Sequence, residues 1–195
     1  MMIAIIDYNS GNVGSVKNAV ERLGFECIVT ANAKMILEAE KVIFPGQGRA
    51  GSSMEQMKAT GLDKVIKSIK NPFLGICLGM QLLSDFSEED STKGLSVIEG
   101  SVERLDVDLK VPHIGWNKVS LRKIDPLMKG VQDGSFFYFA HSYYFKAKLQ
   151  NEVAVTNYGR CFASVVHKDN FYGVQFHPEK SGSSGEQLLN NFLNL

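Results

Sequence analysis

Residues 71–90 read NPFLGICLGMQLLSDFSEED, and this segment contains a junction between an apolar strand and a helix. The run PFLGI (72–76) predicts a buried strand that ends at Cys77, with Gly75 and Gly79 on either side. Flanking glycines are typical of a sharp strand-to-helix turn, where backbone segments approach closely and a side chain would clash. Such a turn holds a nucleophile at the end of a sheet and at a helix N-terminus. Cys77 is therefore the candidate nucleophile.

Strands and helices alternate in the first half of the chain. Apolar runs and helical periodicity predict strands at 2–8, 26–30, 41–44 and 72–76, and helices at 13–23, 34–40, 52–59 and 61–69. This order predicts a parallel, doubly wound sheet with helices on both faces, which binds ligands at the carboxyl ends of its strands. The loop PGQG (45–48) and Cys77 both lie at such ends.

Short strands follow one another in the second half. They are expected at 95–105, 111–121, 134–145, 152–158, 161–170 and 171–176. They predict an antiparallel meander that extends the sheet or packs on its edge, closed by a helix containing Leu188 and Phe192. The fold class is therefore α/β, mostly parallel with an antiparallel β extension. Because no repeat or linker interrupts the chain, we expect one domain over residues 1–195.

Composition excludes several classes of function. Lys plus Arg and Asp plus Glu both number 21, and no basic patch favours nucleic acid or an anionic membrane. The apolar start MMIAIIDYN meets Asp7 too early for a signal peptide or a membrane span. The three cysteines cannot all pair and lack metal-ligand spacing, so we expect a reducing cytoplasm and no metal.

A cysteine nucleophile needs a base and donors for an oxyanion. His177 follows a strand and precedes Pro178, and Glu179 can reach back to orient its imidazole. The backbone N–H groups of Leu78 and Gln47 are candidate oxyanion donors. By themselves the other candidates favour structural roles: Cys27 and Cys161 in the core, His113 and His141 as hydrogen-bonded strand residues, and His167 in a solvated turn.

Three segments together resemble the class I glutamine amidotransferases: GICLGMQ (75–81), PGQG (45–48) and GVQFHPEK (173–180). In that family the cysteine attacks the glutamine side-chain amide, ammonia leaves, and the thioester is hydrolysed. The segments at 5–24, 111–117 and 137–144 are similar to the glutaminase subunits of imidazole glycerol phosphate synthases. This resemblance implies a role in histidine biosynthesis and a heterodimer with a (β/α)₈-barrel cyclase that receives the ammonia. It implies no metal or organic cofactor.

The resemblance also implies a role for each matching residue. Cys77, His177 and Glu179 match the catalytic triad, and the amides of Gln47 and Leu78 match the oxyanion hole. Positions matching the glutamine site are Gly46, Gln81, Glu89, Ser142 and Tyr143. For Glu89 this replaces the solvated loop that the run SEED (87–90) would otherwise predict. Segments that face the partner contain Asn12, Tyr138 and Lys180.

Two positions depart from the family, and other functions stay open. Asn9 stands where the family usually has glycine, and Gln47 where it commonly has a small aliphatic residue. The main alternative is a paralogous glutaminase that feeds a different synthase, such as one amidating a surface sugar. A non-catalytic glutamine-binding relative and a cysteine peptidase are less favoured, because the triad is intact and no motif suggests a peptide-binding cleft.

Overall fold

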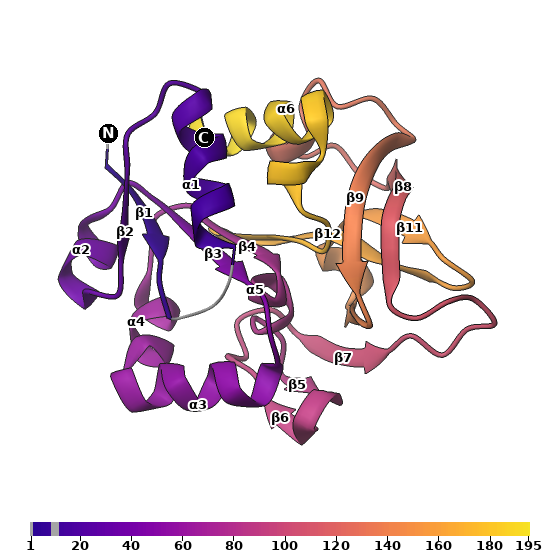
Figure 1. Cartoon of the computed structure of the whole chain (residues 1–195), viewed down its shortest axis with the longest axis horizontal. Helices are drawn as coiled ribbons and strands as arrows, with labels where there is room; N and C mark the ends of the chain where they lie inside the picture. Colours follow the sequence, from indigo (N-terminus) through magenta and orange to yellow (C-terminus); the bar gives the residue numbers. More distant parts are fainter. Residues whose placement is uncertain (1, 9–11) are drawn as a thin grey trace.

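Figure 1 shows a computed structural model of the chain, which describes residues 2–8 and 12–195. Asn9 lies outside the described residues. A nine-stranded mixed sheet crosses the molecule in the order β2-β1-β3-β4-β13-β12-β11-β8-β9. Its parallel part contains β1 (Ile3–Ile6), β2 (Cys27–Thr30), β3 (Lys41–Gly46), β4 (Phe73–Cys77) and β13 (Phe171–Val174). The predicted parallel sheet is confirmed.

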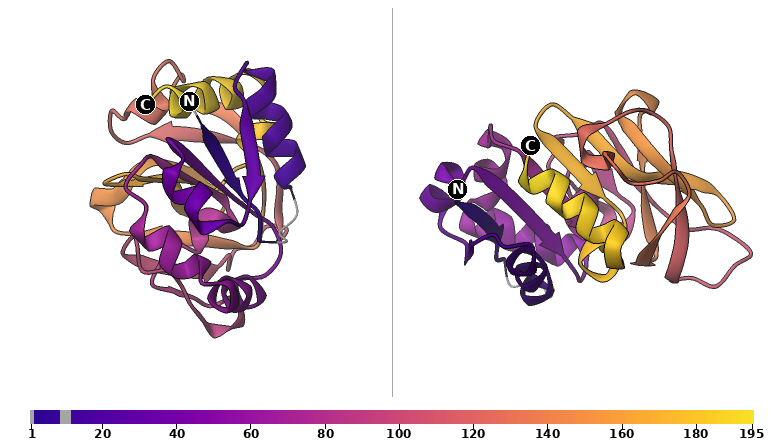
Figure 2. Two further views of the ribbon diagram at one scale, coloured as in Figure 1. Left: turned by 90° about the vertical axis from the view of Figure 1, so that its left-hand side faces the viewer. Right: turned by 90° about the horizontal axis from the view of Figure 1, so that it is seen from above.

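The antiparallel strands continue the same sheet beyond β13. They are β12 (Cys161–Lys168), β11 (Glu152–Asn157), β8 (His113–Leu121) and β9 (Ser135–His141). Of the two arrangements predicted for the second half, the structure therefore has the one that extends the sheet. Figure 2 shows this extension reaching away from the helical half of the molecule.

A second, smaller sheet was not predicted. It contains β5 (Phe86–Ser87), β6 (Thr92–Lys93), β7 (Gly100–Arg104) and β10 (Tyr143–Ala147), in the order β10-β7-β5-β6. Its strand β10 follows β9 after a single residue, Ser142, so the segment read as one strand at 134–145 divides between two sheets. The strand expected at 95–105 is shorter and begins at Gly100.

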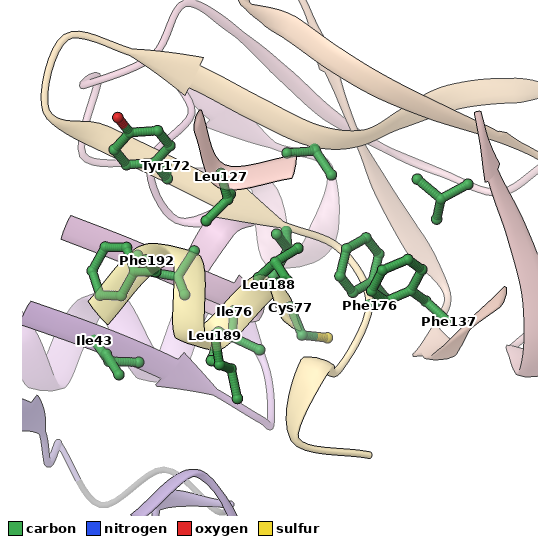
Figure 3. Packing of buried hydrophobic residues seen from close by; sticks show 14 of the residues in the cluster. Ile43, Ile76, Cys77, Leu127, Phe137, Tyr172, Phe176, Leu188, Leu189 and Phe192 are labelled. Atoms are coloured by element: carbon green, nitrogen blue, oxygen red, sulfur yellow. The ribbon is translucent and has the colours of Figure 1, made fainter. Parts of the chain in front are cut away.

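Helices cover both faces of the parallel strands, as predicted. On one face α1 (Val13–Arg22) and α6 (Gly182–Leu193) pack against Ile3, Ile5 and Ile76. On the other lie α2 (Ala33–Glu38), α3 (Ala50–Thr60) and α4 (Leu62–Ser68). Alternate residues of β1 enter the two cores, as strand geometry requires. Figure 3 shows the first of these cores reaching the Cys77 sulfur from the α6 side.

Two residues were placed wrongly from the sequence. Cys161, expected in the core, is exposed at the start of β12. His167, expected in a solvated turn, is near the end of β12, where Asp125 accepts from its Nδ1 at 2.7 Å and Tyr172 stacks on its ring. In both cases the sequence pattern predicted the strand that contains the residue, but not which groups surround its side chain. Among the described residues, none of the helices is long and apolar enough to cross a membrane.

Candidate active site

The carboxyl ends of three adjacent strands form the candidate site. Strand β4 ends at Cys77, between β3 and β13 in the sheet. The register pairs Gly46 of β3 with Cys77, and Val174 of β13 with Ile76. The chain leaving β13 therefore passes beside the cysteine, and His177 lies three residues beyond Val174. This geometry explains how residues 100 positions apart in the sequence meet.

Cys77 occupies a strained turn between β4 and the short helix α5 (Leu78–Gln81). Its φ of 55° and ψ of −111° are unusual for a residue with a side chain, and such strain costs about 1–3 kcal/mol. The glycines predicted to permit the turn are both required. A Cβ on Gly75 would lie 2.7 Å from the Gly79 carbonyl oxygen, and one on Gly79 would lie 2.0 Å from that of Phe44. As the first helical residue, Leu78 has no partner within α5 for its N–H, which suits an oxyanion donor.

His177 and Glu179 form a buried pair beside this turn. The Nδ1 atom of His177 is 2.9 Å from Oε1 of Glu179, whose side chain is fully buried. With Nδ1 engaged there, Nε2 is the ring nitrogen left for Cys77. Burial alone would lower the pKa of His177, but the Cys77 sulfur and the Glu179 carboxylate outweigh it and raise that pKa to about 10. The imidazolium form of His177 is therefore favoured at neutral pH.

Asn12 completes this pair from the start of α1. Its Nδ2 donates to Oε1 of Glu179 at 2.5 Å and lies 3.4 Å from Nδ1 of His177. Burial acts to raise the pKa of Glu179, yet the hydrogen bonds from His177 and Asn12 leave it below its ordinary value. A carboxylate that stays ionised can fix the histidine tautomer and stabilise the imidazolium. The sequence placed Asn12 only in a partner-facing segment, so this contact was missed.

A cavity of about 320 Å³ opens over the cysteine. This volume is within the range of small-molecule sites. Its lining includes Cys77, His177 and Leu78, together with Gly46, Gln47, Gln81, Glu89, Ser142 and Tyr143. All the residues predicted to contact glutamine or its oxyanion therefore gather at one cavity. A larger cavity of about 810 Å³ lies around Cys27 and contains none of them.

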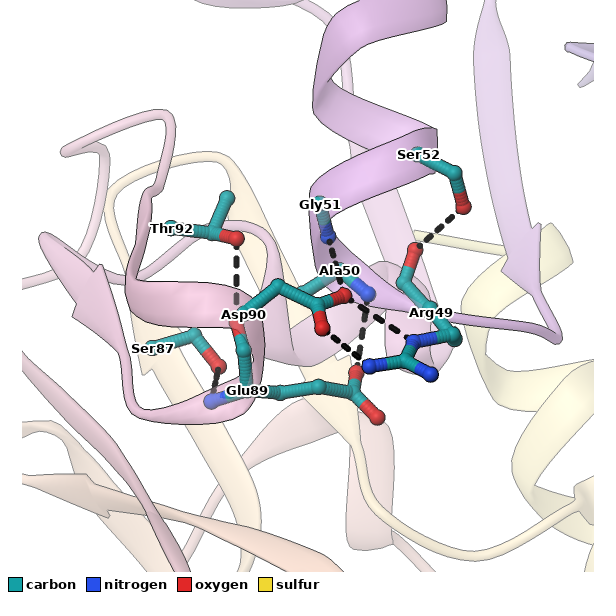
Figure 4. A network of polar contacts seen from close by, with 8 residues as sticks. All are labelled: Arg49, Ala50, Gly51, Ser52, Ser87, Glu89, Asp90 and Thr92. Atoms are coloured by element: carbon teal, nitrogen blue, oxygen red, sulfur yellow. Dashed lines mark hydrogen bonds and ion pairs between the residues drawn. The ribbon is translucent and has the colours of Figure 1, made fainter.

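The segment that joins β5 to β6 brings Glu89 to the cavity. Figure 4 shows it folded against the start of α3, where Ala50 N–H donates to Glu89 Oε2 at 2.8 Å. Asp90 accepts from the Arg49 guanidinium and from the Gly51 N–H. Burial raises the pKa of Glu89. These contacts fix the chain directly after the PGQG loop. Glu89 is half-buried, whereas Glu88 and Asp90 are exposed, as composition alone would predict.

Two further histidines lie beside the cavity, His141 in its wall and His113 behind it. His113 Nδ1 is 3.0 Å from His141 Nε2, and His141 Nδ1 is 2.8 Å from the Tyr143 carbonyl oxygen. Burial lowers the pKa of His113 to about 4 and that of His141 to about 3, so both rings are neutral at pH 7. The structural role predicted for both is consistent with these contacts. His141 also lines the cavity, a position that the sequence did not reveal.

The other two residues expected at a partner interface lie just outside the His177–Glu179 pair. The Nζ atom of Lys180 is 6.0 Å from the centre of the Tyr138 ring, and Lys180 is exposed. The Tyr138 carbonyl accepts from the His177 N–H at 2.9 Å, which ties this surface to the base. Their contact with a partner stays a prediction.

An acyl-transfer enzyme with a cysteine nucleophile requires three features that this site has. They are a strained cysteine between a strand and a helix, a histidine–glutamate pair on the adjacent strand end, and a small cavity. A family profile described as "Glutamine amidotransferase class-I" matches residues 4–195. The chain belongs to the class I glutamine amidotransferases.

Comparison with curated proteins narrows this class. The chain is 46% identical over 198 residues to the imidazole glycerol phosphate synthase subunit HisH of Bacteroides fragilis (strain YCH46), and 43% identical over 197 residues to that of Yersinia pestis. Both comparisons cover 100% of each chain. Solved structures similar in fold include a glutamine amidotransferase (TM-score 0.76, 18% identity, covering 98% of this chain and 97% of that one). Another, from Thermotoga maritima, has TM-score 0.69 and 18% identity, covering 100% and 83%.

Proposed function

We propose that this chain is the glutaminase subunit of an imidazole glycerol phosphate synthase. It hydrolyses glutamine to glutamate and ammonia, and the ammonia passes to a (β/α)₈-barrel cyclase subunit in histidine biosynthesis. The observation that carries this proposal is the meeting of Cys77, His177 and Glu179 at adjacent strand ends beside a cavity of about 320 Å³. Full-length similarity to HisH subunits at 43–47% identity supports the pathway.

The reaction begins with the thiolate of Cys77 and the imidazolium of His177. The thiolate attacks the side-chain amide carbon of glutamine, and the carbonyl oxygen takes the negative charge. Backbone N–H groups of Leu78 and Gln47 stabilise this oxyanion. His177 then gives its proton to the departing nitrogen, so ammonia leaves and a γ-glutamyl thioester remains on Cys77.

Hydrolysis reverses the same steps with water. Glu179 keeps the His177 ring oriented through Nδ1, and Nε2 takes a proton from the attacking water. The second oxyanion uses the same two N–H groups. It collapses with loss of the Cys77 thiolate, which releases glutamate and restores the imidazolium–thiolate pair.

The cavity wall recognises the rest of the glutamine molecule. Gln81 holds the substrate glutamine, Glu89 and the segment Ser142–Tyr143 hold its amino and carboxylate groups, and Gly46 allows close approach of the backbone. Asn12, Tyr138 and Lys180 face the cyclase. The three cysteines are free thiols, as in a reducing compartment, so the proposed location is the cytoplasm.

Glutamate release measured for four samples tests this proposal: the chain alone, with a cyclase barrel, with the barrel's ribonucleotide ligand, and with both. We expect the highest rate with both, and no release by Cys77→Ala under any condition. Cys161→Ala, which removes an exposed free thiol, is the matched control and keeps the parent rate. Turnover that ignores the barrel would support the paralogous glutaminase instead, and turnover by Cys77→Ala would overturn the mechanism.

A further inference from the structure

Gln175 is a buried carboxamide between Cys77 and the cavity wall that the mechanism above does not use. It follows β13, and its relative exposure is 0%. Its Oε1 accepts from Gln81 Nε2 at 3.0 Å, and its Nε2 lies 3.8 Å from the Cys77 sulfur. We propose that Gln175 is a positioning residue that donates an N–H to the Cys77 thiolate and holds the sulfur toward the glutamine amide.

A backbone carbonyl fixes the direction of this carboxamide. The Tyr143 oxygen can only accept hydrogen bonds, so Gln81 must present its NH₂ group there, at 2.7 Å. The same Gln81 nitrogen faces Gln175, which must therefore present its oxygen. The Gln175 NH₂ group is then the one directed at the sulfur. The reverse orientation would set two NH₂ groups against each other in a buried site.

The Tyr143 carbonyl oxygen, which begins this series of hydrogen bonds, is itself held in place. His141, neutral because burial lowers its pKa, keeps its proton on Nδ1 to meet the Tyr143 oxygen at 2.8 Å. His113 then donates from Nδ1 to Nε2 of His141. Both acceptor positions of the Tyr143 oxygen are therefore filled by donors, from His141 and Gln81. This arrangement leaves Gln175 one orientation in which every donor and acceptor of this hydrogen-bond series has a partner.

A donor in this position favours the charged form of the nucleophile. The groups around the sulfur are the His177 imidazolium, the neutral His141 ring and the Ala140 carbonyl oxygen at 3.9 Å. Glu179 lies behind His177. Among these described neighbours, Gln175 offers an N–H that does not depend on pH. Hydrogen bonds to charged groups contribute more than neutral ones, and Cys77 is only 6% exposed, so water compensates poorly for its loss.

The test is site-resolved alkylation of Cys77 by iodoacetamide between about pH 5 and 9, read by peptide mass spectrometry, because the thiolate is the reacting form. Gln175→Met keeps the side-chain length but removes the donor. We expect the Cys77 profile to move to higher pH by about one unit, so that alkylation is about ten-fold slower on the low-pH part of the profile, where the thiol form dominates. Ser164→Ala is the control, since Ser164 is equally buried and pairs with Gln175 only through the backbone. We expect the pH profile of Cys77 alkylation in Ser164→Ala to be that of the parent. The alkylation rate of the exposed Cys161 should be the same in all variants.

A Gln175→Met variant with parent-like thermal unfolding and an unchanged Cys77 profile would overturn the inference. If that variant does not fold, Gln175→Glu keeps an acceptor for Gln81, and at the high-pH end of the range, where its carboxyl group is ionised, it has no donor for the thiolate and repels it. Parent-like alkylation of Gln175→Glu would overturn the inference equally. The inference rests on the proposed role of Cys77, yet the two fail separately. No glutamine turnover by the parent chain with or without a barrel would defeat the proposed function, whereas an unchanged profile in an active enzyme defeats only the inference.

Discussion

Replacing Gly79 by alanine tests how tightly the strand-to-helix turn is packed. The added Cβ would lie 2.0 Å from the Phe44 carbonyl oxygen, whereas ordinary contact begins at 3.4 Å, so β3 and α5 must separate by 1.4 Å (3.4 minus 2.0). Phe44 precedes Gly46, the residue that pairs with Cys77, so the separation moves the PGQG loop away from Cys77. Overpacking costs about 1–3 kcal/mol, and a misplacement of about 1 Å costs about 10²-fold in rate. We expect Gly79→Ala to lose about 3 kcal/mol of stability and at least 10²-fold in kcat.

Urea unfolding and glutamate release measure these two effects on the same protein. Gly14→Ala is the matched control, because Gly14 lies inside α1 and an added Cβ there meets nothing within 4 Å. That change should stabilise the protein by about 0.5–1 kcal/mol, since alanine favours helix more than glycine does. A Gly79→Ala protein with parent-like stability and kcat would show that the close approach of Gly79 to Phe44 is not required.

Three further predictions concern the groups around the site and one distant pair. Glu179→Gln should lower kcat by about 10²–10⁴-fold with little change in KM, because a neutral amide neither fixes the tautomer nor stabilises the imidazolium; an unchanged kcat would exclude Glu179 from the mechanism. Asn12→Asp should lower kcat more than Asn12→Ala, since a second carboxylate beside Oε1 of Glu179, 2.5 Å from the Asn12 amide, repels it; equal rates would contradict this reading. Burial opposes protonation of His167, but Asp125 and the Asp169 carbonyl accept from both ring nitrogens and raise its pKa above the ordinary 6.5. The stability that this pair provides is therefore complete below about pH 6.5 and is lost as pH rises through the folded-state pKa of His167. Urea unfolding between about pH 6 and 9 should show that the excess stability of the parent over His167→Gln shrinks as pH rises. A constant or growing excess would contradict the raised pKa of His167.

Backbone requirements were the part of the site that the sequence predicted best. Few residues tolerate the cramped turn around Cys77, so Gly75 and Gly79 are visible signals, and the structure shows both to be sterically required. The alternation of strands and helices likewise predicted that the PGQG loop and Cys77 lie at the carboxyl ends of parallel strands. Pairing of β4 with β13 could not be predicted from periodicity, because it joins segments almost 100 residues apart. The small sheet could not be predicted either, because β5 and β6 have only two residues each and show no strand periodicity.

Side-chain partners were predicted less well. Asn12 was assigned to a partner-facing segment from family resemblance, and nothing in its neighbourhood in the sequence indicates the Glu179 carboxylate. Lys168 and Asp169 directly after His167 predict a solvated turn, whereas its partner Asp125 comes from a different segment of the chain. A contact between distant segments depends on packing, which local composition does not encode.

Gln175 shows what signal was available and why it was insufficient. The strand FYGVQF (171–176) is otherwise apolar and buried, so a polar residue inside it, between Val174 and Phe176, needs a hydrogen-bonding partner. The sequence therefore indicates that Gln175 has a partner, but not which atom faces which group. That direction follows only from the Tyr143 carbonyl, through Gln81. A triad motif gives the residue types that the chemistry needs, whereas the orientation of the donors around the nucleophile is set by one backbone oxygen on a neighbouring segment.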